Sequence, residues 1–67
     1  MRIVLNGEDR SVDEGTTVAQ IAHSVAGRPG GRGLAVAVNG EVTPRSAWDT
    51  VLHDRDRVEI LAATQGG

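Results

Sequence analysis

The chain has 67 residues, a net charge of −2 and no cysteine. A chain of this length forms one small domain, and without cysteine it has neither disulfides nor thiol chemistry. The slightly acidic balance argues against nucleic acid as a partner, and no apolar run reaches the length that spans a membrane. We therefore expect a cytoplasmic protein with no membrane partner. All seven basic residues are arginine, so no lysine amine is available for linking one copy to another.

The opening segment "RIVLNGEDRSV" predicts a β-hairpin. Ile3 and Leu5 stand at alternate positions, and the Asn-Gly pair that follows them is a strong turn signal. The second strand of this hairpin is expected around residues 10–13.

The next segment, "EGTTVAQIAHSVAG", predicts a helix over residues 17–27, because the apolar period changes from two residues to about 3.6. The apolar stripe of this helix consists of Val18, Ile21, Ala22 and Val25. Thr17 and Gln20 have the spacing of a capping box, and Gly27 suits the C-terminal cap. His23 is expected on the opposite, solvent-facing side.

The second half of the chain contains further strand patterns after the flexible connector "RPGGRG". "LAVAVNGEV" is the clearest strand, and its Asn-Gly pair turns the chain into a short strand near Val42. "TPRSAWDTVLHDRDR" then crosses the molecule, with a single helical turn beginning at Pro44 and a tight turn at "HDRD". The last strand is "VEIL", with Val58 and Ile60 facing inward and Leu61 facing outward.

These elements predict an α+β fold, the ubiquitin-like β-grasp, with one mixed sheet of four to five strands packed on one helix. The first and last strands are expected to lie side by side and parallel in the middle of the sheet. We expect the β-grasp domain over residues 1–63 and a flexible C-terminal Gly-Gly tail over residues 64–67. The predicted core consists of Val18, Ile21, Val25, Ile3, Leu5, Val36, Val38, Val58 and Ile60.

The side chains of the domain predict neither catalysis nor a metal site. His23 and His53 lie far apart in the chain and have no further ligand at metal-binding spacing. Asp54 and Asp56 alternate with arginines, which is the pattern of a solvated, self-neutralising turn. Trp48, the single aromatic residue, is expected to fill the core under the long crossover.

The C-terminal tail has a group that a partner enzyme could use chemically, the carboxylate of its last residue. Gly66 and Gly67 have no side chains, so this part of the backbone suits a narrow channel in a partner enzyme. The α-carboxylate of Gly67 is ionised at neutral pH and is a poor electrophile until a partner activates it with ATP as an acyl-adenylate. On this hypothesis the carboxylate is a substrate of partner enzymes, and the chain is a carrier rather than an enzyme.

Three stretches together resemble the ThiS family, the sulfur-carrier proteins of thiamin biosynthesis: "RIVLNGE", "AVNGEVTPRSAW" and "DRDRVEILAATQGG". The resemblance covers essentially the whole chain. It implies a carrier with no bound cofactor, whose Gly67 is adenylated and converted to a thiocarboxylate, with Gly66 beside it in the partner's active site. It also implies three partners: an adenylating (E1-like) enzyme, an enzyme that supplies sulfur from cysteine, and thiazole synthase, which takes the sulfur into the thiazole ring.

Strand alternation also predicts a docking surface. Val4 and Leu61 fall on the sheet face away from the helix, next to each other if the first and last strands pair. Ala35 and Ala37 add a flat apolar floor. Exposed apolar residues beside a reactive tail suggest contact with a partner protein.

Three alternative hypotheses share these features. The small subunit of molybdopterin synthase is also a β-grasp sulfur carrier with the same ending, although the Pro-Arg…Trp segment favours the thiamin pathway. A ubiquitin-like protein modifier would use Gly67 to form isopeptide bonds instead of a thiocarboxylate. A plain β-grasp interaction module would have an incidental tail.

Overall fold

The computed structural model of the chain describes residues 1–26 and 33–62. These residues form five strands, one α-helix and one short 3-10 turn. The strands are β1 (Arg2–Leu5), β2 (Glu8–Ser11), β3 (Leu34–Val38), β4 (Glu41–Thr43) and β5 (Arg57–Ala62). The helix is α1 (Val18–Ala26), and the 3-10 turn η1 spans Arg45–Ala47.

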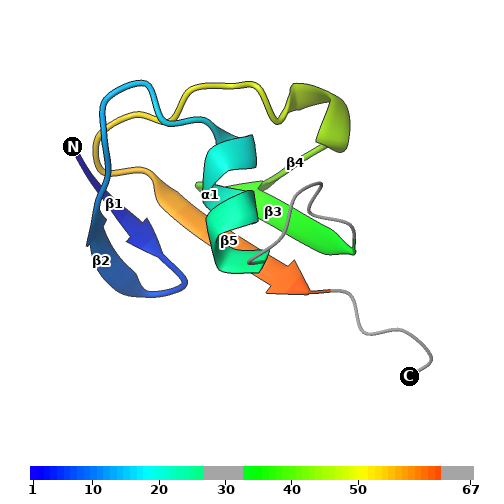
Figure 1. Cartoon of the computed structure of the whole chain (residues 1–67). Coiled ribbons are helices and arrows are strands. Elements are labelled where there is room, and N and C mark those ends of the chain that lie inside the picture. The colour runs from blue at the N-terminus through cyan, green and yellow to red at the C-terminus, as the bar shows by residue number, and fades with distance from the viewer. Residues whose placement is uncertain (27–32, 63–67) are drawn as a thin grey trace.

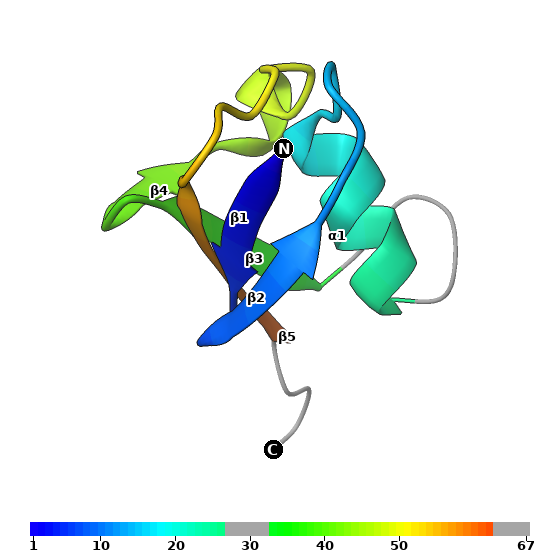
Figure 2. The same ribbon diagram turned by 90° about the vertical axis from the view of Figure 1, so that its left-hand side faces the viewer.

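The five strands make one mixed sheet in the order β2-β1-β5-β3-β4. β5 is the central strand, and β1 pairs with it in parallel. Every other pair of neighbouring strands is antiparallel. The helix α1 covers one face of this sheet, and the crossover from β4 to β5 passes over one end of it (Figures 1 and 2). This is the ubiquitin-like β-grasp that the sequence predicted, with its first and last strands parallel and adjacent.

The N-terminal hairpin turns earlier than predicted. Asn6 and Gly7 both have positive φ, at 49° and 84°, and β2 begins at Glu8 directly after them. A two-residue turn of this kind matches the twist of the two strands, so pairing resumes at once and Leu5 lies opposite Glu8. The second strand therefore spans residues 8–11, and the expected range of 10–13 was wrong.

The helix confirms the predicted capping box. The backbone N–H of Thr17 donates to Gln20 Oε1 at 2.9 Å, and the backbone N–H of Gln20 donates to Thr17 Oγ1 at 3.2 Å. The prediction that Val25 is buried was wrong: Val25 is 44% exposed. It lies in the last turn of α1, beyond the helix residues that reach the core. His23 is half-buried rather than fully exposed. Gly27, the predicted C-terminal cap, lies outside the described residues.

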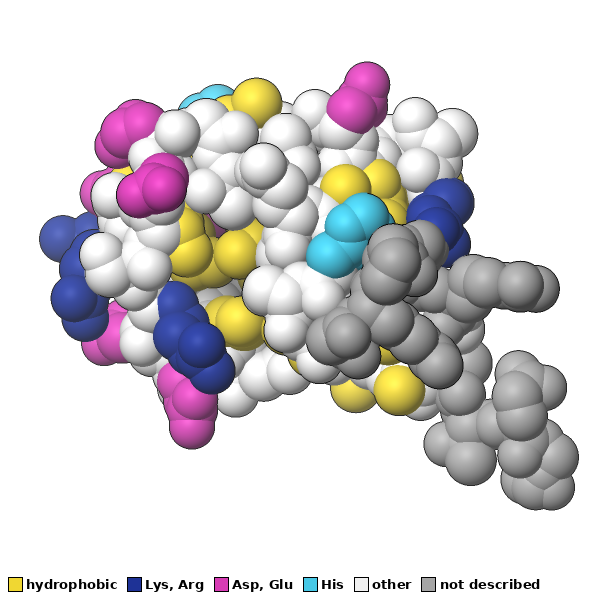
Figure 3. Space-filling view, in the orientation of Figure 1, with side chains coloured by type: hydrophobic (Ala, Val, Ile, Leu, Met, Phe, Trp, Pro, Cys, Tyr) yellow, Lys and Arg dark blue, Asp and Glu magenta, His cyan; other side chains and the backbone are white. Residues whose placement is uncertain are grey.

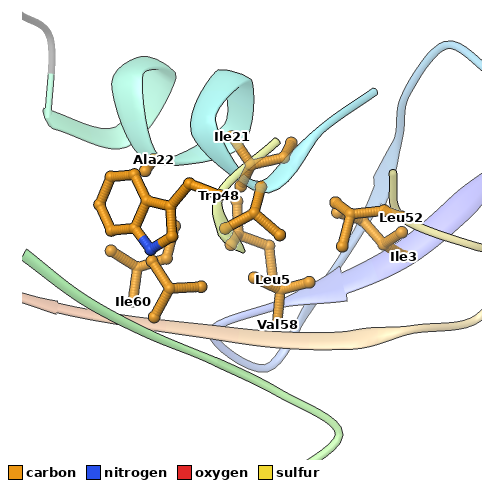
Figure 4. Packing of buried hydrophobic residues seen from close by; sticks show 10 residues of the cluster. Ile3, Leu5, Ile21, Ala22, Trp48, Leu52, Val58 and Ile60 are labelled. Carbon is orange, nitrogen blue, oxygen red and sulfur yellow. The ribbon is translucent and has the colours of Figure 1, made fainter. Parts of the chain in front are cut away.

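One cluster of buried apolar side chains fills the space between α1 and the sheet (Figure 4). Its members are Ile3, Leu5, Val18, Ile21, Ala22, Val36, Trp48, Leu52, Val58 and Ile60. Val38, predicted in the core, is half-buried and packs against the cluster. In this β-grasp the alternation of strand residues and the helical stripe account for eight of the ten members, and the other two come from the crossover.

Trp48 and Leu52 are the two core residues of the crossover. Trp48 is 4% exposed, as predicted, and its Nε1–H donates to the Thr43 carbonyl oxygen at 3.1 Å. Leu52 was not predicted, because the crossover has no period that marks an inward side. It is buried because the crossover is hydrogen-bonded to the start of α1: the Leu52 N–H donates to the Thr16 oxygen at 2.8 Å, and the Val18 N–H donates to the Thr50 oxygen at 3.0 Å.

The two predicted turns of the crossover are present. Pro44 precedes η1 in an extended conformation, and the Ala47 N–H donates to its carbonyl at 2.8 Å. Near β5 the chain turns at Arg55, which has a φ of +72°, and the Asp56 N–H donates to the His53 carbonyl at 3.1 Å. Within residues 1–26 and 33–62, no helix has the length and apolarity needed to cross a membrane.

Candidate functional site

The candidate site begins at the C-terminal end of β5. All of β3 pairs with β5, from Val38 opposite Val58 to Leu34 opposite Ala62. β1 pairs with β5 only up to Leu5 opposite Val58. The last residues of β5 are therefore held by β3 on one side, and Ala62 is the last described residue before the predicted tail.

The sequence assigns the chemistry to Gly66 and Gly67, which come four and five positions after Ala62, the last residue of β5. Gly66 and Gly67 lie outside the described residues, and so does the predicted boundary between residues 63 and 64. Ala62, the last described residue, belongs to the sheet rather than to the helix (Figure 1), and the predicted tail over residues 64–67 stays a prediction.

Val4 and Leu61 lie on the predicted face of the sheet but not next to each other. Val4 is level with Arg57, so Leu61 lies four positions further along β5. The expected adjacency was wrong because alternation determines the face of a residue, whereas the parallel register determines its height along the sheet. Val4 is half-buried, and Leu61 is 70% exposed.

The actual neighbours of Leu61 form an apolar strip, which we define as Leu61, Ala35, Ala37 and Val42. Leu61 pairs with Ala35 across β3 and β5, and Ala37 pairs with Val42 across β3 and β4. Val42 is 75% exposed. These residues, with Asn6 and Glu59 among others, line a shallow hollow of about 410 Å³. Val42 was not predicted in this surface, although the Asn-Gly turn before it fixes its position opposite Ala37.

Charged side chains of β1 and β2 form ion pairs with one another. Arg2 lies 3.9 Å from Asp9, and Arg10 lies 3.6 Å from Glu8. Figure 3 shows acidic and basic side chains interspersed at the end of the molecule where β1 and β2 lie. The charges there neutralise each other locally, so this end presents no field of a single sign.

The aspartates of the turn before β5 act as hydrogen-bond acceptors. Asp54 Oδ1 accepts the backbone N–H of Arg2 at 2.8 Å, and this bond, with the nearby Arg55 guanidinium, lowers the pKa of Asp54 below its usual 3.8. Asp56 Oδ2 accepts the backbone N–H of His53 at 2.8 Å. Among residues 1–26 and 33–62, no group of three or more His, Cys, Asp or Glu side chains is placed to hold a metal ion.

The fold and the strip at the end of β5 define the class of protein: a small ubiquitin-like β-grasp protein with an exposed apolar face beside its C-terminal segment. The chain is similar to the crystal structure of the thiamine biosynthesis protein ThiS from Geobacter metallireducens, with 34% identity, a TM-score of 0.78 and full coverage of both chains. An NMR solution structure of a thiamine biosynthesis protein from the same organism gives 34% identity and a TM-score of 0.75, covering 100% of this chain and 88% of that one.

The sequence model of the ThiS family matches residues 3–67. The comparison with curated proteins returned no match. This chain belongs to the ThiS family.

Proposed function

We propose that this protein is a sulfur carrier in thiamin biosynthesis and that the sulfur is carried on the carboxyl group of Gly67. The observation that supports this most is the family match, which runs through to residue 67 on a chain that is similar over its full length to ThiS structures. The fold supports it as well, because the central strand β5 ends two residues after buried Ile60 and leads directly into the tail.

In the proposed reaction the protein is a co-substrate of partner enzymes. A carboxylate oxygen of Gly67 attacks the α-phosphorus of ATP in the adenylating enzyme, which forms the acyl-adenylate and releases pyrophosphate. Hydrosulfide, with sulfur that originates in cysteine, then attacks the acyl carbon and displaces AMP, which leaves the thiocarboxylate and one proton. Thiazole synthase takes the sulfur into the thiazole ring. Gly66 accompanies Gly67 into these active sites, because a backbone without side chains fits a narrow channel.

The apolar strip is the proposed docking surface for the adenylating enzyme. It lies on the face of the sheet opposite α1, and Leu61 stands directly before the last described residue, Ala62. A partner that binds the strip therefore also binds beside the origin of the tail. Val4 remains a predicted contact at the other end of this face, at the level of Arg57.

Intact-mass measurement tests the proposed function. The full chain is incubated with a ThiS-type adenylating enzyme, ATP and a cysteine-derived sulfur source. The expected result is the mass change of one oxygen replaced by one sulfur. Adducts of high mass would instead indicate a protein modifier, and an unchanged mass would indicate an interaction module. Transfer of the sulfur to thiazole synthase, but not to a molybdopterin synthase large subunit, distinguishes the thiamin pathway from the molybdopterin pathway.

A further inference from the structure

β5 continues along the sheet beyond the point at which β1 turns away from it. The parallel register of β1 and β5 ends at Leu5 opposite Val58. On this side of β5 the Val4 N–H donates to the Asp56 carbonyl oxygen and the Asn6 N–H donates to the Val58 carbonyl oxygen, both at 2.9 Å. After Asn6 the chain enters the hairpin to β2. In a parallel ladder the next groups of β5 that face this side are the N–H and C=O of Ile60, and β1 has no backbone left to pair with them.

The side chain of Asn6 takes the place of that missing backbone. Its Oδ1 accepts the Ile60 N–H at 2.8 Å, and its Nδ2 donates to the Ile60 carbonyl oxygen at 3.4 Å. A carboxamide has one acceptor and one donor side by side, as a peptide group has, so it extends the ladder by one step. The backbone and the side chain of Asn6 together hold Val58 and Ile60, two successive residues on this side of β5.

We propose that Asn6 is a positioning residue for the C-terminal segment: its amide fixes Ile60 and thereby the end of β5 from which the tail continues. This inference rests on the proposed function, because it matters for sulfur loading only if Gly67 is the reacting group. Asn6 also lines the hollow of the apolar strip, and Leu61 directly follows the residue that Asn6 holds. Fixing Ile60 therefore orients the docking residue and the origin of the tail together.

Asn39 provides a matched comparison within the same molecule. It opens the other Asn-Gly turn, with φ values of 52° and 86° at Asn39 and Gly40, close to those of Asn6 and Gly7. Its Oδ1 accepts the Arg57 N–H at 2.9 Å, and its Nδ2 donates to Asp56 Oδ1 at 2.9 Å. Asn39 Oδ1 thus accepts the N–H of the first residue of β5, as Asn6 Oδ1 accepts that of the fourth.

The test compares Asn6→Gly with Asn39→Gly in the full chain. Glycine accepts positive φ without strain, so each substitution removes the amide and keeps the turn. Residue-resolved amide hydrogen exchange is measured by NMR under conditions in which both variants are folded. In Asn6→Gly the Ile60 amide should exchange roughly tenfold faster relative to the slowest core amides, since it loses its only partner on that side. In Asn39→Gly the Ile60 amide should exchange at the wild-type rate.

A conservative variant separates the acceptor of the Asn6 side chain from its donor. Asn6→Asp keeps the acceptor for the Ile60 N–H and loses the donor to the Ile60 carbonyl. It should restore most of the protection of the Ile60 amide that Asn6→Gly loses. Unchanged Ile60 exchange in Asn6→Gly, or an equal increase in Asn39→Gly, would overturn the inference.

The second readout is sulfur loading by the adenylating enzyme, measured against carrier concentration. Asn6→Gly should raise the apparent KM severalfold and leave kcat nearly unchanged, whereas Asn39→Gly should change neither. Equal KM values for the two variants would show that Asn6 is merely structural. Failure of the wild-type chain to be loaded would contradict the proposed function, and the Ile60 exchange contrast would still decide whether Asn6 fixes the end of β5.

Discussion

Leu61 lies opposite Ala35 in the antiparallel pairing of β3 and β5, on the face of the sheet that α1 does not cover. Ala35 is small and exposed, so the Leu61 side chain is left 70% accessible. A leucine this exposed at the end of a central strand adds nothing to the core. Its position instead suits contact with a partner that also takes up the residues after Ala62.

Leu61→Arg should fold normally and weaken binding to the adenylating enzyme by roughly tenfold or more, because a charge replaces the largest apolar group of the strip. Isothermal titration calorimetry measures the Kd, and circular dichroism checks the fold. Val51→Arg is the control, since Val51 is also an exposed apolar residue, 44% accessible, but lies in the crossover outside the strip. Equal affinities for Leu61→Arg and wild type would place the docking surface elsewhere.

Ile21→Ala should destabilise the domain severely. Ile21 is buried between α1 and the sheet, and truncating a buried isoleucine typically costs about 2–5 kcal/mol. A domain of this size has a total stability of only about 5 kcal/mol, so the Tm should fall sharply or the chain should unfold. His23→Ala is the control, because the His23 side chain on the same helix is only half-buried. It should leave both the Tm and sulfur loading close to wild type. If His23→Ala blocked sulfur loading in a folded chain, the hypothesis that the domain has no catalytic side chain of its own would be wrong.

Trp48→Phe should lower the free energy of unfolding by about 1–2 kcal/mol. The phenyl ring keeps much of the buried apolar volume but loses the Nε1–H bond to the Thr43 oxygen. It also weakens the contact with Arg45, whose guanidinium lies 4.4 Å from the centre of the indole ring. Urea denaturation followed by circular dichroism measures the change. Arg45→Gln, which removes only the cation, should account for less than half of it; a larger share would mean that the Nε1–H bond is minor.

The pH dependence of stability should show the contribution of Asp54. Because its folded pKa is lowered, chiefly by the Arg2 N–H, the stabilisation is fully present above the unfolded pKa and is lost as pH falls through the folded value. Asp54→Ala should therefore lower Tm at neutral pH, and the difference from wild type should shrink below pH 3.8. Asp49→Ala, an exposed aspartate outside this turn, is the control for loss of charge. A difference that stays constant down to about pH 2 would rule out this linkage.

The sequence predicts faces and elements better than it predicts registers. Val58 and Ile60 face inward and Leu61 faces outward, as alternation requires, and Trp48 is buried, as expected of the single aromatic residue in the crossover. Alternation says nothing of where a parallel neighbour ends, so the separation of Val4 from Leu61 follows only from the structure. Leu52 shows the same limit, since irregular backbone has no period that marks its buried side.

The sequence does not predict the hydrogen bonds between the Asn6 side chain and Ile60, for a related reason. The Asn-Gly pair predicts the turn, and the turn alone explains why asparagine stands there. Its second role, as a partner for Ile60, depends on β5 extending past β1, which is a property of the assembled sheet.

Sulfur loading should depend on a free carboxyl group at Gly67, and intact-mass measurement of a C-terminally altered chain tests this most directly. Deleting Gly67, or adding one residue after it, should abolish the replacement of oxygen by sulfur, because the reacting carboxyl group is then displaced from the partner's active site. The circular dichroism spectrum should be unchanged, since the buried cluster ends at Ile60. Normal sulfur loading of the extended chain would contradict the account.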